Sequence, residues 1–150
     1  MNVQDVMTVN VESCGPQANL AEAAMIMWKR DCGVVPIVDA HGKLLGMITD
    51  RDICMAVATR DRRAAEISVS EVMSKEVLTC TPVEDVHDAM TMMQKDQIRR
   101  LPVVDESGVL CGILSLNDIA LHAKKGASKK RISHRDAINT LKAISQHRQA

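Results

Sequence analysis

A chain of 150 residues, 46% apolar and 25% charged, has the composition of a folded globular protein, which excludes disorder for most of its length. Lys and Arg together number 19, as do Asp and Glu, so the formal net charge is zero and no overall field draws the protein to nucleic acid or to an anionic membrane. The charge is unevenly spread, because from Ala120 onward eight Lys and Arg residues accompany one acid, Asp136. A basic tail therefore follows an acidic body.

The content of aromatic, apolar and cysteine residues excludes further classes of protein. The chain has no Phe or Tyr and one Trp, Trp28, which argues against a stacking platform for single-stranded nucleic acid. No stretch approaches the ~18 apolar residues of a membrane span, and the N-terminus lacks a secretion signal, so we expect a cytoplasmic location. Five Cys without a CxxC motif indicate neither a disulfide framework nor a zinc site. Catalytic and metal-binding motifs are absent, so we expect no enzyme activity, no bound metal and no required cofactor.

The first third of the sequence recurs in its middle at a constant offset of 66 residues. Val6-Met7 returns as Val72-Met73, VPIVD (35–39) as LPVVD (101–105), and Asp52-Ile53 as Asp118-Ile119. Such a repeat decides the architecture before any local pattern does. We assign residues 1–58 to repeat 1, 59–68 to a linker, 69–123 to repeat 2, and 124–150 to a basic linker and a C-terminal helix.

Each repeat has the pattern of a β-α-β-β-α unit. A short first strand around Val9 or Val77 precedes apolar residues at helical spacing, which run from Leu20 to Met27 and from Val86 to Met93. Two apolar runs then flank a turn at Gly42 or Gly108, which predicts a hairpin, and a second helix begins at Thr49 or Ser115. One copy is too small to bury both faces of its sheet. We therefore expect an α+β fold of two repeats packed with pseudo-twofold symmetry, plus a helical tail.

The tail predicts one further helix. Ser133 and Asp136 form a plausible N-cap pair, and Ala137, Ile138, Leu141 and Ile144 fall on one side of the helix that follows. Such a helix would dock on the body or on a partner subunit. Nucleic-acid binding by the basic stretch and membrane-surface binding by the helix are rival uses, but neither has aromatic or extended basic support, so we expect neither partner.

The junctions between the last strand and the last helix of each repeat carry the candidate site. In GMITDRD (46–52) and GILSLND (112–118), a hydroxyl residue is followed three positions later by Asp52 or Asp118. A helix N-terminus presents free N–H groups that suit phosphate, and an acid one turn later can accept hydrogen bonds from a sugar diol. The same pair also fits a capping box, which stabilises a helix and binds nothing. The spacing leaves both interpretations open.

The two repeats, their VPIVD and LPVVD strands and their G-h-h-[TS]-x-x-D endings resemble a tandem CBS domain pair, the Bateman module, from about residue 3 to residue 122. Segments TDRDI (49–53) and IRRLPV (98–103) are similar to those of short stand-alone prokaryotic CBS-pair proteins of the hypoxic response protein type. The resemblance implies a regulatory sensor that binds adenosine-containing ligands in the cleft between the repeats. AMP is the ligand we favour, with ADP, ATP, NAD and S-adenosylmethionine as alternatives.

The resemblance also implies which residues contact the ligand. The ribose-holding acid of the family corresponds to Asp52 and Asp118, and its hydroxyl to Thr49 and Ser115. The other expected contacts are Gly33, Val34, Arg51 and Cys32 in repeat 1, Arg99, Arg100, Ile98 and Asn117 in repeat 2, and Val9 and Lys75 on the first strands. Because arginine forks suit phosphate, we expect repeat 2 to bind phosphorylated ligands more tightly. An exposed charged loop is the alternative interpretation of the two arginines.

Two features outside the motifs remain. Trp28 lies on the first helix of repeat 1, where repeat 2 has Gln94, and we interpret it as a homodimer contact, with burial under the tail as the alternative. Cys14 and Cys32 could form a redox-sensitive pair, but ordinary structural thiols are the favoured interpretation.

Three functions compete. They are a nucleotide sensor that acts on an unidentified effector protein, an interaction module with a non-functional pocket, and nucleic-acid binding through the tail. We prefer the sensor, because both repeats keep the hydroxyl and the acid.

Overall fold

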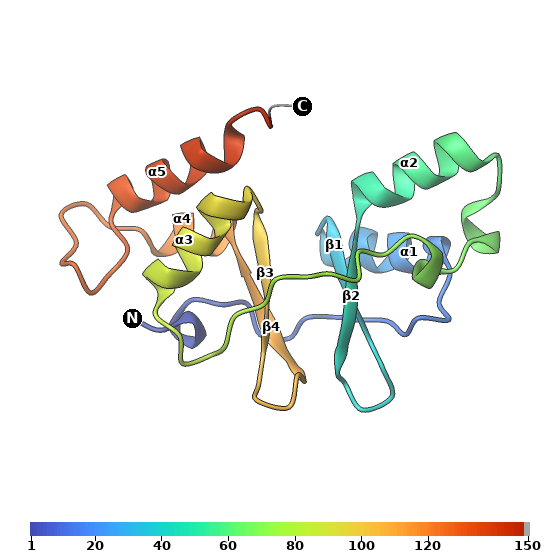
Figure 1. Ribbon diagram of the computed structural model, residues 1–150, viewed down its shortest axis with the longest axis horizontal. Coiled ribbons are helices and arrows are strands. Elements are labelled where there is room, and N and C mark those ends of the chain that lie inside the picture. The colour runs from blue at the N-terminus through green and yellow to red at the C-terminus, as the bar shows by residue number, and fades with distance from the viewer. Residues whose placement is uncertain (149–150) are drawn as a thin grey trace. The chain divides into compact units, whose positions relative to one another are not determined.

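The computed structural model describes residues 1–148, which fold into two compact units (Figure 1). Unit 1 consists of residues 1–11, 78–106 and 111–148, and unit 2 of residues 12–77 and 107–110. Each unit therefore contains the helices and most of the hairpin of one repeat together with the N-terminal segment of the other repeat. The repeats are units of sequence, and their N-terminal segments are exchanged between the units of structure.

Unit 2 holds the elements of repeat 1. These are α1 (Leu20–Arg30), β1 (Val34–Val38), β2 (Leu44–Thr49), α2 (Asp50–Arg60) and the 3-10 helices η2 (Ala64–Glu66) and η3 (Val69–Glu71). β1 and β2 form the predicted antiparallel hairpin, with Gly42 in the left-handed region at its turn (φ 79°). Leu20 and Ala23 of α1 pack in a core with Ile37 and Ile48 of the hairpin.

Unit 1 holds the elements of repeat 2 and the tail. These are η1 (Val3–Asp5), α3 (Val86–Asp96), β3 (Arg100–Val104), β4 (Leu110–Ser115), α4 (Leu116–His122) and α5 (His134–Ser145). The predicted apolar positions of α3 are all buried, and Met93 packs with Leu101, Leu114 and Ile119 in the core of the unit. The helical and hairpin patterns of both repeats are thus confirmed.

Residues whose φ is positive explain where the first helix of each repeat ends. α1 starts at a capping box formed by Asn19 and Glu22, and it stops at Asp31, which takes a left-handed conformation with φ 49°. α3 is capped by Asp85 and stops in the same way at Gln97, with φ 52°. The chain then turns directly into the next strand of each repeat.

The predicted first strand of each repeat is not a continuous strand. In repeat 1 it is reduced to two single-residue bridges, Thr8 with Ile113 and Cys14 with Ile37. Between them, Asn10 has a positive φ of 25°, and the chain passes from unit 1 to unit 2. The strand is broken because its two ends pair with different hairpins. Repeat 2 repeats this arrangement, with Ser74 bridged to Met47 and Cys80 bridged to Val103.

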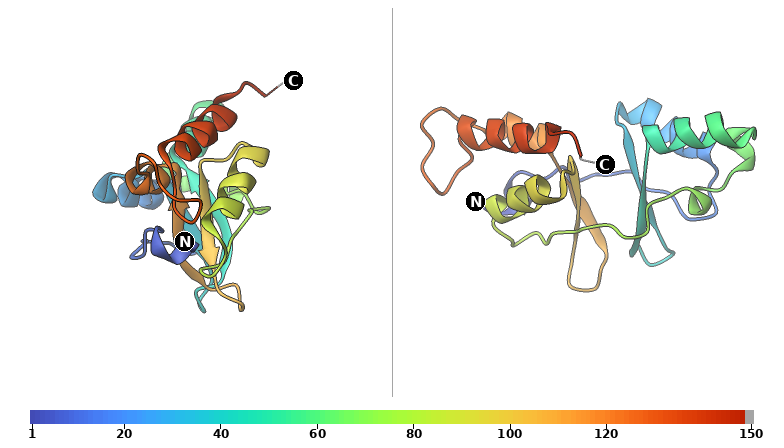
Figure 2. Two further views of the ribbon diagram at one scale, coloured as in Figure 1. Left: turned by 90° about the vertical axis from the view of Figure 1, so that its left-hand side faces the viewer. Right: turned by 45° about the horizontal axis from the view of Figure 1, so that its top comes forward.

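The tail forms the predicted helix and docks on its own unit. Ser133 and Asp136 form a capping box at the start of α5, which packs against α3 and α4 (Figure 2). Ile132, just before the helix, is fully buried in the core of unit 1. The predicted apolar side is only partly correct, because Ala137 and Ile144 pack on the core whereas Ile138 and Leu141 are exposed. Among the described residues, no helix is long and apolar enough to cross a membrane.

Candidate functional site

The unit 1 site is built around Asp118, where β4 runs into α4. The Asp118 Oδ2 atom accepts hydrogen bonds from the Ser115 backbone N–H at 2.7 Å and from the Ser115 hydroxyl at 2.6 Å. The Asp118 Oδ1 atom accepts a third from the Thr8 hydroxyl at 2.9 Å. Asp118 is only 9% exposed, one of few buried polar residues in the described chain. A residue of repeat 1 therefore completes the surroundings of the acid of repeat 2.

The unit 2 site repeats this geometry around Asp52 with fewer contacts. The Asp52 Oδ2 atom accepts a hydrogen bond from the Thr49 backbone N–H at 2.9 Å, and the Asp52 N–H donates to the Thr49 hydroxyl at 3.1 Å. Ser74 occupies the position equivalent to Thr8, and its backbone pairs with Met47. Within residues 1–148, no hydrogen bond joins the side chains of Ser74 and Asp52. The two sites are alike in backbone and different in hydrogen bonding.

Both motifs form a capping box, so the structural interpretation of the hydroxyl and the acid is confirmed. Capping does not use up the carboxylates, because an ionised carboxylate offers about four acceptor positions. At Asp52, one hydrogen bond from Thr49 leaves most of these positions open. The same residues can therefore cap a helix and accept hydrogen bonds from a ligand.

The glycines that open the two motifs allow the exchanged segments to approach. A Cβ atom on Gly112 would lie 2.6 Å from the carbonyl oxygen of Thr8, and one on Gly46 would lie 2.5 Å from that of Ser74. Both distances are shorter than a carbon atom tolerates, so a side chain at either position would push the exchanged segment away. The glycine is therefore needed to bring a residue of one repeat beside the acid of the other.

The predicted residues before each hairpin lie next to the helix that carries the acid. The Arg99 carbonyl accepts a hydrogen bond from the backbone N–H of Leu116 at 3.0 Å, and the Gly33 carbonyl accepts one from that of Asp50 at 3.1 Å. Arg99 is exposed and Arg100 is half-buried, so their side chains lie at the surface near α4. Unit 2 has no cation at these two positions.

The remaining predicted contacts divide between the two units. Val9 lies in unit 1 directly after Thr8, and Lys75 lies in unit 2 directly after Ser74; both are exposed. Ile98 packs against the core of unit 1 and Val34 is buried, whereas Cys32, Arg51 and Asn117 are exposed or nearly so. Thr8, which contacts Asp118, was not among the predicted residues, although a hydroxyl follows the repeated Val-Met pair in both repeats, at Thr8 and at Ser74.

The cysteines give no support to a redox pair. Cys14 is half-buried, and burial together with the nearby Glu22 carboxylate raises the pKa of its thiol. Burial raises the pKa of Cys80 more strongly, to about 12. A raised pKa keeps a thiol protonated and therefore slow to react. In the part of the chain that the structure describes, no three His, Cys, Asp or Glu side chains are grouped to hold a metal ion.

Known sequences match both repeats of this chain. A sequence profile of the CBS domain matches residues 3–59 and 69–125. CBS domain-containing protein YhcV of Bacillus subtilis is 38% identical over 139 residues, 90% of this chain and 97% of that protein. Homoserine O-acetyltransferase of Methanohalophilus mahii is 34% identical over 126 residues, but these make up only 25% of the enzyme. The chain thus spans nearly all of one relative and a quarter of the other.

Solved structures show the same fold. The CBS domain pair of protein MJ0100, crystallised with 5′-methylthioadenosine and S-adenosyl-L-methionine, is 32% identical with a TM-score of 0.74, over 81% of this chain and 94% of that chain. Hypoxic Response Protein I, whose structure contains two coordinated zinc ions, is 28% identical with a TM-score of 0.75, over 83% of this chain and 100% of that chain.

Proposed function

Because the chain belongs to the CBS domain family and contains two copies of the domain, we propose that it is a regulatory module that binds adenosine-containing ligands at Asp118 and Asp52. The observation that carries the proposal is the pairing, in both units, of a carboxylate that has open acceptor positions with a segment from the other repeat. The adenosine ligands of the MJ0100 domain pair, a relative at 32% identity, support the ligand class.

Each part of a nucleotide has a residue type to receive it. The vicinal hydroxyls of ribose are two donors, and a carboxylate such as Asp52 can accept both. In the absence of Phe and Tyr, the adenine ring would lie among aliphatic side chains such as Val9 and be recognised by backbone groups. A phosphate would lie at Arg99 and Arg100, whose guanidinium groups donate in a fixed planar geometry. AMP combines all three parts and is the ligand we propose.

We also propose that the module forms a homodimer and passes its ligand state to an effector protein. Trp28 on α1 is 84% exposed in the single chain, and Met25, one turn earlier, is exposed beside it. Within unit 2, no described residue buries Trp28, and this exposure is the observation on which we base a dimer contact. A large exposed aromatic side chain with an exposed apolar neighbour is typical of a protein contact.

A thermal-shift panel tests the ligand class. The panel compares AMP, ADP, ATP, NAD and S-adenosylmethionine, and GMP serves as the control for the base. A ligand at 100 times its Kd adds ~2.7 kcal/mol of stability, which is a clear shift in Tm. Absence of a shift with every adenosine ligand would contradict the proposal and favour an interaction module with a non-functional pocket.

Site variants locate the binding. Loss of a hydrogen bond to a charged group costs about 1.5 to 3 kcal/mol, so Asp118→Ala is expected to weaken AMP binding at least tenfold, and Asp52→Ala to remove a weaker second site. Isothermal titration measures both. Each variant also loses a capping box, so unfolding measurements run in parallel, and a loss of stability without any loss of affinity would leave the acids with a capping role alone.

A further inference from the structure

The two site carboxylates differ in how many acceptor positions are already occupied, and Thr8 accounts for part of that difference. Of about four positions on a carboxylate, Asp118 uses three, two for the N–H and hydroxyl of Ser115 and one for the Thr8 hydroxyl. Asp52 uses one, for the Thr49 N–H, among the hydrogen bonds of residues 1–148. About one acceptor position is therefore open on Asp118 and about three on Asp52.

A ribose diol presents two hydroxyl donors to one carboxylate. Asp52 can accept both without losing a hydrogen bond, whereas Asp118 can accept both only if a donor that it already holds leaves. The Ser115 donors belong to the capping box three residues away and are fixed by the start of α4. Thr8 lies 110 residues away in sequence and its side chain is exposed, so it is the donor that can leave.

Thr8 can release Asp118 without unfolding its segment. Its backbone N–H donates to the Ile113 carbonyl at 2.9 Å, and its carbonyl accepts from the Ile113 N–H at 3.0 Å. These two hydrogen bonds hold the backbone in place, and rotation about one side-chain bond turns the hydroxyl away from the carboxylate. The exchange of Thr8 for a ribose hydroxyl is therefore a local event.

We propose that Thr8 is a specificity-determining residue, because its hydroxyl competes with the ligand ribose for Asp118. The inference rests on the proposed function and makes the two sites unequal. The unit 1 site gives up a hydrogen bond when it accepts a ribose diol, so it depends on the phosphate contacts of Arg99 and Arg100. The unit 2 site accepts the diol freely and has no arginine at the equivalent positions Gly33 and Val34. In unit 1 the arginines thus favour a nucleotide over a nucleoside, whereas Thr8 reduces the preference of the site for a ribose over a sugar that lacks the diol.

The test is Thr8→Val in the Asp52→Asn background, in which only the unit 1 site is titrated. Valine keeps the shape of the side chain and removes the donor. We expect the affinities for adenosine and AMP to rise about tenfold, the effect of one hydrogen bond to a charged group. The affinity for 2′,3′-dideoxyadenosine, which has no diol, is expected to stay the same. Thr8→Ser keeps the hydroxyl and is expected to restore the parent affinities.

The other site provides a matched control. Ser74→Ala in the Asp118→Asn background is expected to leave adenosine binding unchanged, because Ser74 gives no hydrogen bond to Asp52 among the described residues. Equal or weaker adenosine binding by Thr8→Val would overturn the inference and show that Thr8 holds Asp118 in place for the ligand. A matching gain for dideoxyadenosine would also overturn it. The parent chain is titrated first, and failure to bind any adenosine ligand would reject the proposed function itself.

Discussion

Arg99 distinguishes the unit 1 site from the unit 2 site, although the backbones of the two sites are alike. Its backbone is fixed against the start of α4 by the hydrogen bond from Leu116, while its guanidinium is exposed. The equivalent residue of repeat 1 is Gly33, whose carbonyl makes the same backbone contact with Asp50. The backbone of both sites is thus conserved within the molecule, and only one of them carries a cation at this position.

Substitution of Arg99 by Ala therefore tests the phosphate role. Loss of a charge-assisted contact costs about 1.5 to 3 kcal/mol, so the substitution is expected to weaken AMP binding at least tenfold. Adenosine binding is expected to change much less, because adenosine has no phosphate. Isothermal titration of the variant with both ligands measures the difference. Equal losses for AMP and adenosine would mean that Arg99 belongs to an exposed charged loop and not to a phosphate site.

At the scale of elements, local patterns predicted more than non-local pairings. The helices begin and end where capping residues and apolar spacing indicate, because these signals act within one turn of the chain. The first strand is different, since Thr8 pairs with Ile113 while Cys14 pairs with Ile37. Nothing in the sequence near Val9 specifies which hairpin a backbone group will find. The repeated hydroxyl after the Val-Met pair marks Thr8 as a candidate, but its contact with Asp118 could not be predicted for the same reason, although the acid itself could.

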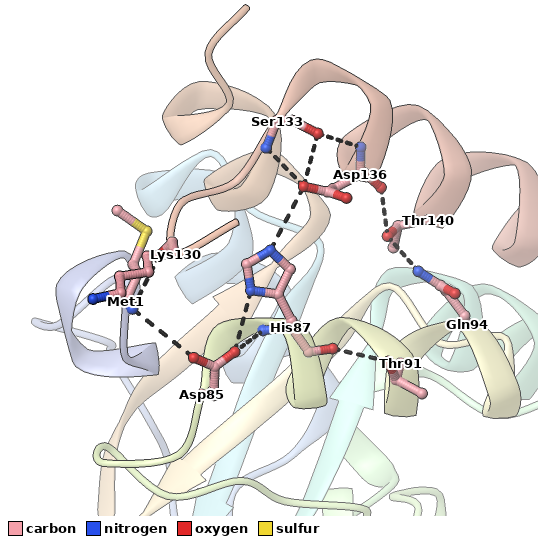
Figure 3. Close-up of polar contacts among 9 residues, drawn as sticks. All are labelled: Met1, Asp85, His87, Thr91, Gln94, Lys130, Ser133, Asp136 and Thr140. Carbon is pink, nitrogen blue, oxygen red and sulfur yellow. Dashed lines mark hydrogen bonds and ion pairs between the residues drawn. The ribbon is translucent and has the colours of Figure 1, made fainter. Parts of the chain in front are cut away.

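The tail helix is held on α3 by polar contacts that the sequence also did not reveal (Figure 3). His87 lies between two carboxylates, with Nδ1 3.2 Å from Asp85 and Nε2 3.6 Å from Asp136. Further along the interface, Gln94 donates a hydrogen bond to the Thr140 hydroxyl at 2.8 Å. The Asp136 carboxylate also closes the capping box of α5 with Ser133, so one acid supports both the helix and its docking.

The Asp136 carboxylate is expected to stabilise α5 and its docking at neutral pH and to lose this effect in acid. The hydrogen bond from the Ser133 backbone N–H, with further help from the Ser133 hydroxyl and His87, holds its pKa below the ordinary 3.8. A lowered pKa gives stability that is present above the unfolded value and is lost as the pH falls through the folded one. Asp136→Asn is therefore expected to cost about 1 kcal/mol at neutral pH and progressively less below about pH 4.

Urea unfolding of the parent and the variant from pH 7 to pH 2.5, followed by circular dichroism, measures this difference. Asp88→Asn is the matched control, because Asp88 also lies in the first turn of a helix and has no side-chain bond to the tail within the described chain. A difference between parent and Asp136→Asn that is constant with pH would show that ionisation of Asp136 stabilises neither α5 nor its docking.

The tail also contributes to the core, so two truncations have different expected results. Ending the chain after His122 removes Ile132, which is fully buried in unit 1, and is expected to cost about 2 to 5 kcal/mol or more. Ending it after Ser133 keeps Ile132 and removes α5 with the residues that follow it. Because no predicted site residue lies in the tail, both folded proteins are expected to keep the parent affinity for AMP. Thermal unfolding measures the stability of both truncated proteins, and titration measures their affinity for AMP. Lost affinity in the protein that ends after Ser133 would show that α5 supports the site.

At the scale of the whole molecule, the tail breaks the equivalence of the two repeats. In unit 1, α5 covers the face of α3 that carries Gln94. The equivalent face of α1 in unit 2 carries Trp28, and no described residue covers it. Among the described residues, the face of α3 is therefore covered by the tail, whereas the equivalent face of α1 is exposed and is the surface that we propose for a second copy.

Trp28→Gln gives α1 the residue that α3 has at the equivalent position, Gln94. This substitution is expected to weaken the dimer. Buried tryptophans at an interface commonly contribute 2 kcal/mol or more to binding, so the dissociation constant is expected to rise at least about thirtyfold. Light scattering at micromolar concentration measures the change. Leu121→Gln is the control, because Leu121 is as exposed as Trp28 but lies on α4 of unit 1. If Trp28→Gln stays as dimeric as the parent while Leu121→Gln dissociates, the contact lies on unit 1 and the assignment of Trp28 is wrong. If the parent itself is a monomer at this concentration, the proposed homodimer is wrong.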